Sequence, residues 1–473
     1  MKLEKIDSCR WRLRRQGKMN ADGVVYASAG MVAPLEADKV LEQVSNVACL
    51  PGITGRSMAM PDAHWGYGFP IGGVAAFGAE EGVISPGGVG YDISCGVRLL
   101  RSSLKASECG DRLPRLMDAL FSAVPSGIGK SGGVRVDDAG VARVLTEGAR
   151  WAVDAGFGEP PDLEACEDIG AMPGALPEKV SARALERGGP QLGTLGSGNH
   201  FLEVQEVDEV YDEKAAFCFG LFKGQLVVLV HTGSRGLGYQ VCDDYIRVML
   251  GASRKYGIAL PDRQLACAPL KSAEGKDYFA AMACAANYAK ANRQVITHLI
   301  RQAFGRVFGG EFLEVVYDVS HNIAKMEIHQ VNGSPALLCV HRKGATRAFP
   351  AGHEELPPRY KAVGQPVLVP GSMGTCSYVL SGTPHAMSET FGSVCHGAGR
   401  VWSRSKASRN VDSTNLRHEL EGRGISVRTA SMKGLAEEAP AAYKDVCEVV
   451  AVCEKAGIAS KVARMRPLGV VKG

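Results

Sequence analysis

Hydrophobic positions along the chain form two kinds of pattern, one typical of helices and one typical of buried strands. Helical spacing of apolar residues predicts helices over 35–49, 113–124, 141–155, 278–308, 412–420 and 441–455. Short apolar, β-branched runs predict buried strands over 71–77, 226–230, 312–319, 337–341 and 366–370. These elements interleave without the regular alternation of a parallel α/β fold. The sequence therefore predicts one large α+β domain over residues 1–473.

Glycine is the residue type that stands out in the composition. The chain has 58 glycines, which lie in short loops after apolar runs rather than in repeats. Enzymes use such loops to bring the backbone close to a ligand. The stretch 51–96 is rich in these loops. The segment 158–177 is rich in Pro, Gly and Glu, and we expect it to be an exposed connection or a surface insertion.

The bulk composition is that of an ordinary globular protein, with 45% hydrophobic and 22% charged residues. A net charge of +4 is too weak to indicate nucleic-acid binding by itself, and the basic run 461–472 reads equally as solvated surface or as a binding surface. No apolar stretch reaches the ~20 residues that span a bilayer. The 14 cysteines contain no C-x-x-C pair. We therefore expect a cytoplasmic protein with reduced cysteines and no membrane contact.

Four histidines share one setting, a loop rich in small residues. His231 and His321 follow predicted strands, His200 lies in Gly-Ser-Gly-Asn-His, and His396 lies in Cys-His-Gly-Ala-Gly-Arg. A single histidine is usually structural, but four in such loops favour a shared site.

Asp92 and Cys95 provide two further candidate ligands within one short loop. A carboxylate and a thiol three residues apart can converge on one ion, and the carboxylate favours harder ions such as Mn²⁺. One sulfur can bridge two ions, so a pair of ions could be held by Asp92, Cys95, His200, His231 and His321. Two neighbouring ions suit phosphoryl transfer. A structural zinc site is the alternative, but its ligands normally come in closely spaced pairs, whereas these are dispersed.

Three glycine-rich loops, 196–199, 371–374 and 397–400, can direct backbone N–H groups at phosphate, and Arg235 and Arg400 can add bidentate contacts. A P-loop motif is missing, and the G-x-G-x-x-G string at 127–132 follows no strand, so we interpret it as a plain turn. The chain has no K-x-D-G lysine for nucleotidyl transfer, whereas His396 could attack phosphorus directly.

Eight sequence blocks resemble the RtcB-type RNA-splicing ligases, in the order in which that family has them. They are MPDAHWGYGFPIGG (60–73), GYDISCG (90–96), GSGNHFLE (196–203), HTGSRG (231–236), HNIA (321–324), PGSMG (370–374), HGAGR (396–400) and GVVKG (469–473). The resemblance implies the family's α+β architecture with a central metal cleft. It also implies that GTP and Mn²⁺ are used to join RNA ending in a 2′,3′-cyclic phosphate or 3′-phosphate to RNA with a 5′-hydroxyl. The reaction would pass through a GMP–histidine intermediate and a 3′-guanylylated RNA end.

The resemblance implies a role for each matching residue. His396 would carry GMP, Asp62 would orient the reacting groups, and Arg235 would bind RNA phosphate. Cys95 would bridge two Mn²⁺ ions, one also held by Asp92 and His200 and the other by His231 and His321. The residues around the guanosine nucleotide would be Asn199, His200, Phe201, Leu202, Glu203, His321, Asn322, Pro370, Gly371, Ser372, Met373, Ser377, His396, Gly397, Ala398, Gly399, Tyr443 and Lys472.

The sequence departs from many relatives at Thr232 and Tyr239, where Ser and His are expected; both lie outside the proposed ligand set, and Tyr239 could alter the RNA path. The resemblance suggests a monomer and raises an archease as an accessory partner, and it leaves tRNA splicing and RNA repair both open. The main alternative is a metal-dependent phosphodiesterase that opens cyclic phosphate ends without ligation and needs neither His396 nor Lys472. A non-catalytic RNA-binding relative is disfavoured by the full set of candidate ligands.

Overall fold

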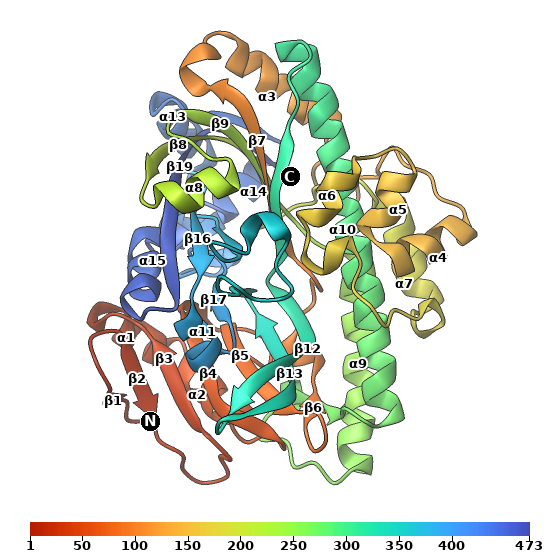
Figure 1. The fold of residues 1–473 in the computed structure, drawn as a ribbon, viewed down its shortest axis with the longest axis vertical. Coiled ribbons are helices and arrows are strands. Elements are labelled where there is room, and N and C mark those ends of the chain that lie inside the picture. The colour runs from red at the N-terminus through yellow and green to blue at the C-terminus, as the bar shows by residue number, and fades with distance from the viewer.

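The computed structural model describes residues 1–473, with the exception of the side chain of Asp138, and its strands form two large, mainly antiparallel sheets (Figure 1). The lower sheet in the figure has seven strands, in the order β1 (Glu4–Lys5), β2 (Arg10–Leu13), β3 (Asp22–Tyr26), β4 (Ile53–His64), β5 (Ile71–Gly78), β13 (Ser334–Lys343) and β12 (Asn322–Val331). Two short pairs accompany the large sheets: β6 (Val83–Ile84) with β10 (Ala268–Pro269), and β14 (Ala345–Arg347) with β17 (Ser393–Cys395).

The upper sheet in Figure 1 has eight strands. Its main path is β11 (Glu314–Ser320), β7 (Gly96–Lys105), β9 (Gln225–Thr232), β8 (Phe201–Val210), β19 (Ala459–Lys472), β16 (Ser377–Gly382) and β15 (Pro366–Val369), and β18 (Ser426–Thr429) pairs with β19. Both faces of this sheet are covered. Along β9, Val227 and Leu229 enter one hydrophobic cluster, while Leu226, Val228 and Val230 enter another. This two-sided burial explains why the strand is continuously apolar rather than alternating.

Helices surround the two sheets. They are α1 (Ala29–Ala37), α2 (Val40–Val47), α3 (Arg112–Ala123), α4 (Asp138–Glu147), α5 (Ala149–Asp154), α6 (Pro160–Glu164), α7 (Ala182–Gly188), α8 (Glu213–Phe219), α9 (Arg235–Lys255), α10 (Ala273–Phe308), α11 (Pro384–Thr390), α12 (Arg404–Asn410), α13 (Ser413–Gly422), α14 (Met432–Glu437) and α15 (Val446–Lys455). Helix α10 follows most of the long axis of the molecule (Figure 1). Ser272 caps its first turn by accepting the Gly275 N–H, and Gly309 ends it in the left-handed region. Among the described residues, no helix has both the length and the apolar character needed to cross a membrane.

The α+β fold expected from the sequence is confirmed, and so are the longest predicted helix and the five predicted strands. Two predicted helices are each interrupted. The helix predicted over 35–49 falls within α1 and α2, which are separated at Lys39 (φ 59°), and that over 141–155 divides into α4 and α5 at Gly148 (φ 58°). The string 127–132 lies between α3 and α4 with neither a helix nor a strand, as the plain-turn interpretation predicted.

The structure corrects one expectation about surface segments and shows the setting of a second. The segment 158–177 is not an exposed connection, because Asp162, Cys166 and Glu167 in its middle are at most 3% exposed and pack beside α10. The basic run 461–472, for which a solvated surface and a binding surface were both open, belongs to β19, and three of its four charges are paired. Arg464 bonds Asp208, Arg466 bonds Glu206 and Lys461 bonds Glu454, while Lys472 is buried.

The two large sheets are joined directly at one residue. Strand β11 of the eight-stranded sheet ends at Ser320, and β12 of the seven-stranded sheet begins at Asn322, so His321 stands between them. The 51–96 stretch was expected to hold a single strand, but it also contains the 12-residue β4, which carries Asp62 to the same region. The junction of the sheets is therefore where the candidate residues meet.

Candidate metal and nucleotide site

The candidate ligands lie together at one end of the eight-stranded sheet, where neighbouring strands begin or end. Strands β11, β7, β9, β8 and β19 are neighbours in that order, and each is antiparallel to the next. In an antiparallel sheet the end of one strand lies beside the beginning of its neighbour. The residues at these strand ends therefore lie together at one end of the sheet. They are His321, Cys95, His231, His200 and Lys472.

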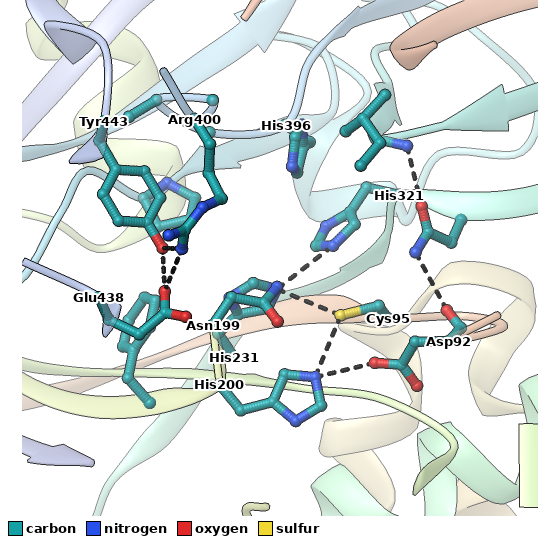
Figure 2. Close-up of a pocket in the computed structure, with 18 of the residues that line it drawn as sticks. Asp92, Cys95, Asn199, His200, His231, His321, His396, Arg400, Glu438 and Tyr443 are labelled. Atoms are coloured by element: carbon teal, nitrogen blue, oxygen red, sulfur yellow. Dashed lines mark hydrogen bonds and ion pairs between the residues drawn. The ribbon is translucent and has the colours of Figure 1, made fainter. Parts of the chain in front are cut away.

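The predicted ligands form one compact cluster around Cys95 (Figure 2). Its Sγ lies 3.3 Å from His231 Nε2 and 3.4 Å from His200 Nε2. Beyond these contacts, His321 Nε2 is 3.3 Å from His231 Nε2, and Asp92 Oδ2 is 2.8 Å from His200 Nε2. Two triads result, Asp92–Cys95–His200 and Cys95–His231–His321, and in each triad the ligand atoms lie within 4.8 Å of one another. The two triads share the sulfur.

Burial sets the protonation of this cluster. It lowers the pKa values of His200, His231 and His321, so their imidazoles are neutral, and it raises the pKa of the Cys95 thiol well above the usual range. Burial also acts to raise the pKa of Asp92, but its interactions with His200 and Arg235 outweigh burial and leave that pKa at about 2. Neutral imidazoles and a carboxylate offer lone pairs, and a thiol ionises once a cation is bound. This donor set fits a pair of divalent first-row metal ions.

His396 faces the cluster from the side of the seven-stranded sheet. Its ring centroid lies 4.8 Å from that of His321 (Figure 2). Its Nδ1 lies 2.6 Å from Oδ2 of Asp62. The same carboxylate oxygen accepts the backbone N–H groups of His396 and Gly397. Burial acts to raise the pKa of Asp62, but the contacts with His396 dominate and lower it. Gly399 makes this close approach feasible, since a Cβ there would lie 2.0 Å from the Asp62 carbonyl oxygen.

The cluster lies in a cavity of about 510 Å³. Most of the residues predicted for metal, nucleotide or RNA contacts line it, namely Asp92, Cys95, Asn199, His200, Phe201, Glu203, His231, Arg235, His321, Asn322, Pro370, Gly371, Ser372, Met373, His396, Gly397, Ala398, Gly399, Tyr443 and Lys472. Three predicted residues lie outside the lining. Leu202 points into a hydrophobic cluster, Ser377 accepts a hydrogen bond from Gln205, and Asp62 lies behind His396.

Of the three predicted anion-binding loops, 196–199 keeps the most backbone donors free, whereas the other two each use at least two of theirs within the protein. In the described structure the N–H groups of Ser197, Gly198 and Asn199 make no backbone or side-chain hydrogen bond, and Gly196 and Gly198 have positive φ. Alternation of this kind turns successive N–H groups into one concavity. In the loop 371–374, by contrast, Gly371 and Ser372 donate to Ser377 and Thr375. In the loop 397–400, Gly397 donates to Asp62 and Ala398 to Pro370.

The expectation that Arg400 binds phosphate is wrong, because its guanidinium is already engaged within the protein. It donates to Glu438 Oε2 at 2.9 Å, to the Tyr443 hydroxyl at 3.1 Å, and to two backbone carbonyl groups. Glu438, which the sequence did not single out, is 1% exposed and also accepts from Tyr443 (Figure 2) and from Arg404. Arg404 is half exposed at the cavity, close to Asn199, and is the arginine left available to an anion there.

Three further lining residues had no signal in the sequence or were passed over. His64 lies in the block 60–73 but was not singled out, and burial lowers its pKa to about 3, so it is neutral. Lys343 is buried and donates to the carbonyl groups of Tyr67, Phe69 and Gly87. It therefore has a structural role, because it links two loops by hydrogen bonds. Tyr91 stacks on Tyr239, one of the two departures from the family pattern, with ring centroids 4.8 Å apart, and both line the cavity. Thr232, the other departure, donates its hydroxyl to Leu195 outside the ligand set.

Two further titratable groups, Glu203 and Lys472, line the cavity. Glu203 accepts a hydrogen bond from Gln205 at 2.6 Å, and burial raises its pKa to about 8. Lys472 donates to the carbonyl groups of Gly198 and His200, and burial lowers its pKa. The Lys472 ammonium thus holds the backbone of the loop 196–199, whose N–H groups are free.

Comparison with known proteins gives one consistent result. A family model described as "tRNA-splicing ligase RtcB" matches residues 43–473. The chain is 57% identical over 476 residues to a "tRNA-splicing ligase RtcB" of Thermococcus kodakarensis, covering 100% of this chain and 99% of that protein. It is 56% identical over 477 residues to a protein of the same name from Archaeoglobus fulgidus, covering 100% and 99%. An "RNA-splicing ligase RtcB" of Mycobacterium bovis is 56% identical over 434 residues, which cover 91% of this chain and 100% of that protein.

Proposed function

The chain belongs to the RtcB family of tRNA-splicing ligases, and from that premise we propose that it joins RNA 2′,3′-cyclic phosphate or 3′-phosphate ends to 5′-hydroxyl ends, using GTP and Mn²⁺. The physiological process would be tRNA splicing or RNA repair. The protein would act as a GTP-dependent enzyme through a histidine that carries GMP.

The observation that carries this proposal is the pairing of His396 with Asp62. A buried carboxylate 2.6 Å from Nδ1 holds the proton on that nitrogen and leaves Nε2 with its lone pair. The ring lies beside His321, at the edge of the metal-ligand cluster. An activated imidazole next to a candidate metal pair is the arrangement that a nucleotidyl carrier requires.

The two triads are the proposed metal sites. Asp92 and His200 would hold one Mn²⁺, His231 and His321 the other, and Cys95 both. Bound ions would supply Lewis-acid stabilisation of charge on the reacting phosphate oxygens. The three neutral imidazoles and the thiol, which is protonated until a cation is bound, support this assignment.

The cavity has complementary places for the parts of GTP. The free N–H groups of 196–199 suit a phosphate, and Arg404 lies beside them. Glu203 is a buried carboxyl group that is protonated near neutral pH in the nucleotide-free protein, and its ionised form would accept the adjacent N–H donors on the Watson–Crick edge of guanine. The remaining nucleotide contacts are proposed for Phe201, Tyr443 and the loop 370–373.

The proposed reaction has three bond exchanges. His396 Nε2 forms a bond to the α-phosphorus of GTP, and pyrophosphate leaves. An oxygen of the RNA 3′-phosphate then takes GMP from the histidine. Finally the 5′-hydroxyl attacks the 3′-phosphorus and GMP leaves. A cyclic phosphate would first be hydrolysed to the 3′-phosphate. Activation is needed because a 3′-phosphate is a poor electrophile with a poor leaving group, whereas GMP is a good one.

RNA would reach this centre past Arg235, the first residue of α9. Its guanidinium lies 3.2 Å from His200 Nδ1 and lines the cavity. A cation at this position suits the phosphate next to the reacting end.

The proposal is tested against the phosphodiesterase alternative by offering the protein two RNA strands, one with a cyclic phosphate or 3′-phosphate end and one with a 5′-hydroxyl. A ligase yields a joined product that depends on GTP. A phosphodiesterase opens the cyclic end and joins nothing, with or without GTP. The alternative also leaves the Asp62–His396 pair without a task, since it does not need a nucleophilic histidine.

A further inference from the structure

Helix α10 contains a polar run that is buried on every side. The residues from Lys290 to Gln294 are each at most 1% exposed, although four of the five are polar or charged. A helix that faced solvent would turn part of such a run outward. Because buried polar groups need hydrogen-bond partners, this run must be matched by groups on the elements around it.

Arg293 uses its guanidinium to join three segments that carry candidate metal ligands. Nη1 donates to the carbonyl oxygens of Ser94 at 2.9 Å and Thr232 at 3.1 Å. Nε and Nη2 form two bonds of 2.8 Å with the carboxylate of Asp318. Ser94 precedes Cys95, Thr232 follows His231, and Asp318 lies three residues before His321.

Asn292 holds the remaining ligand segment in the same way. Its Oδ1 accepts the N–H groups of Gly193 at 2.7 Å and Thr194 at 3.1 Å, and its Nδ2 donates to the carbonyl oxygens of Thr194 at 3.1 Å and Gly233 at 3.3 Å. The next residue along, Leu195, accepts the Nδ1 proton of His200 at 3.0 Å. Asn292 therefore fixes the backbone against which the His200 ring is oriented.

We infer that Asn292 and Arg293 are positioning residues that set the spacing of both metal triads from a single helix. The inference rests on the proposed metal site. Four ligand-bearing segments, far apart in the sequence, meet two consecutive side chains of one rigid element. Side chains that orient metal ligands from behind affect metal affinity strongly, although they never touch the ion.

The local backbone explains why such support is needed. Ser94 has φ 54°, a strained conformation for a residue with a side chain, and it lies directly before the shared ligand Cys95. Arg293 bonds its carbonyl group, and the Ser94 hydroxyl lies 2.7 Å from that of Ser320. At Gly96 a Cβ would lie 3.2 Å from the Arg293 guanidinium carbon, so the arginine packs tightly against the turn.

The same helix provides a matched control. Asn287 is also fully buried, accepts the N–H of Met172 at 2.6 Å, and donates to the carbonyl oxygens of Leu145, Thr146 and Met172. It makes as many hydrogen bonds as Asn292, yet its partners belong to the helical region around α4 and α5 and not to the ligand segments. Loss of Asn287 should cost similar stability without disturbing the metals.

The experiment compares Asn292→Ala, Asn287→Ala and Arg293→Lys with the wild type, in the full chain. Apo thermal unfolding measures stability, and calorimetric titration with MnCl₂, with Mn²⁺ EPR, measures affinity and stoichiometry. We expect both asparagine variants to lose similar apo stability. Only Asn292→Ala and Arg293→Lys should bind Mn²⁺ about 10- to 100-fold more weakly.

Equal Mn²⁺ affinity in Asn292→Ala and Asn287→Ala would overturn the inference. If Asn292→Ala does not fold, the test rests on Arg293→Lys, which keeps the positive charge. An unchanged Mn²⁺ affinity in Arg293→Lys would then overturn the inference. A wild type that binds no pair of Mn²⁺ ions would overturn the metal assignment of the proposed function as well. The two failures are therefore distinguishable.

Discussion

Asp62 and His396 are 334 positions apart in the chain, yet the Asp62 carboxylate lies 2.6 Å from Nδ1 of the His396 ring and also accepts the His396 backbone N–H. Strand β4 of the seven-stranded sheet delivers the acid, and the residue after β17 is the histidine. The contact fixes both the orientation and the tautomer of the imidazole. It places Nε2 as the free nitrogen.

Asp62→Asn should therefore slow transfer of GMP to the protein by about 10²-fold or more, because the amide cannot stabilise positive charge on the ring. The rate of label incorporation from GTP measures this. Asp162→Asn is the control, since Asp162 is a buried carboxylate paired with Arg301 away from the site. An unchanged labelling rate in Asp62→Asn would show that the contact is only structural.

Cys95→Ala should remove both metal ions, because the sulfur belongs to both triads. Metal analysis after dialysis should fall from about two Mn²⁺ per chain toward none, with loss of guanylylation and of cyclic-phosphate opening. Cys284→Ala, a buried cysteine of α10, should keep both ions. Full metal content with retained labelling in Cys95→Ala would contradict the bridging assignment.

Metal affinity should rise with pH. Burial lowers the pKa values of His231 and His321 and raises that of Cys95, so near neutral pH the free protein has neutral imidazoles and a protonated thiol. Binding must then release the thiol proton, and the Mn²⁺ association constant should increase about tenfold per pH unit between about pH 6 and pH 8. Calorimetry in buffers of different ionisation enthalpy counts the proton directly. Binding without proton release would contradict a thiolate ligand.

Glu203→Gln should stabilise the nucleotide-free protein increasingly as pH rises. Burial raises the Glu203 pKa to about 8 in the folded state, against 4.5 ordinarily, so between these values the folded state holds a proton that the unfolded state has lost. Stability of the wild type should fall across that window. We expect the variant to melt a few degrees higher at pH 8 than the wild type and equally at pH 5, while binding GTP less tightly. Glu209→Gln, on the same strand but more exposed, should show no such trend.

The sequence singled out His231 and His321 as candidate metal ligands because each follows a strand with a strong apolar signal. The runs before His231 and His321 are buried on both faces, which produces continuous hydrophobic stretches that end at the ligand. The compact turn of Asp92 and Cys95 needed no tertiary information. The long helix α10 was equally clear from its periodicity and length.

Other features were missed because tertiary contacts decide them. Strand β4 lacks an alternating pattern, since residues 57–63 are all buried, and it contains Pro61 and two register shifts. Arg400 resembles a phosphate ligand in the sequence because its actual partner, Glu438, lies 38 residues away along the chain. The polar run of α10 resembles a solvated face in sequence, whereas its partners come from four distant segments.

The central claim is that His396 carries GMP, and covalent labelling tests it most directly. The protein is incubated with Mn²⁺ and GTP labelled in the α-phosphate, denatured, and examined for bound label and for the mass of the modified peptide. The account predicts a label that is lost in acid, survives alkali, maps to His396 and is missing in His396→Ala, while that variant still binds Mn²⁺. A stable label on another residue, or ligation that proceeds in His396→Ala, would contradict it.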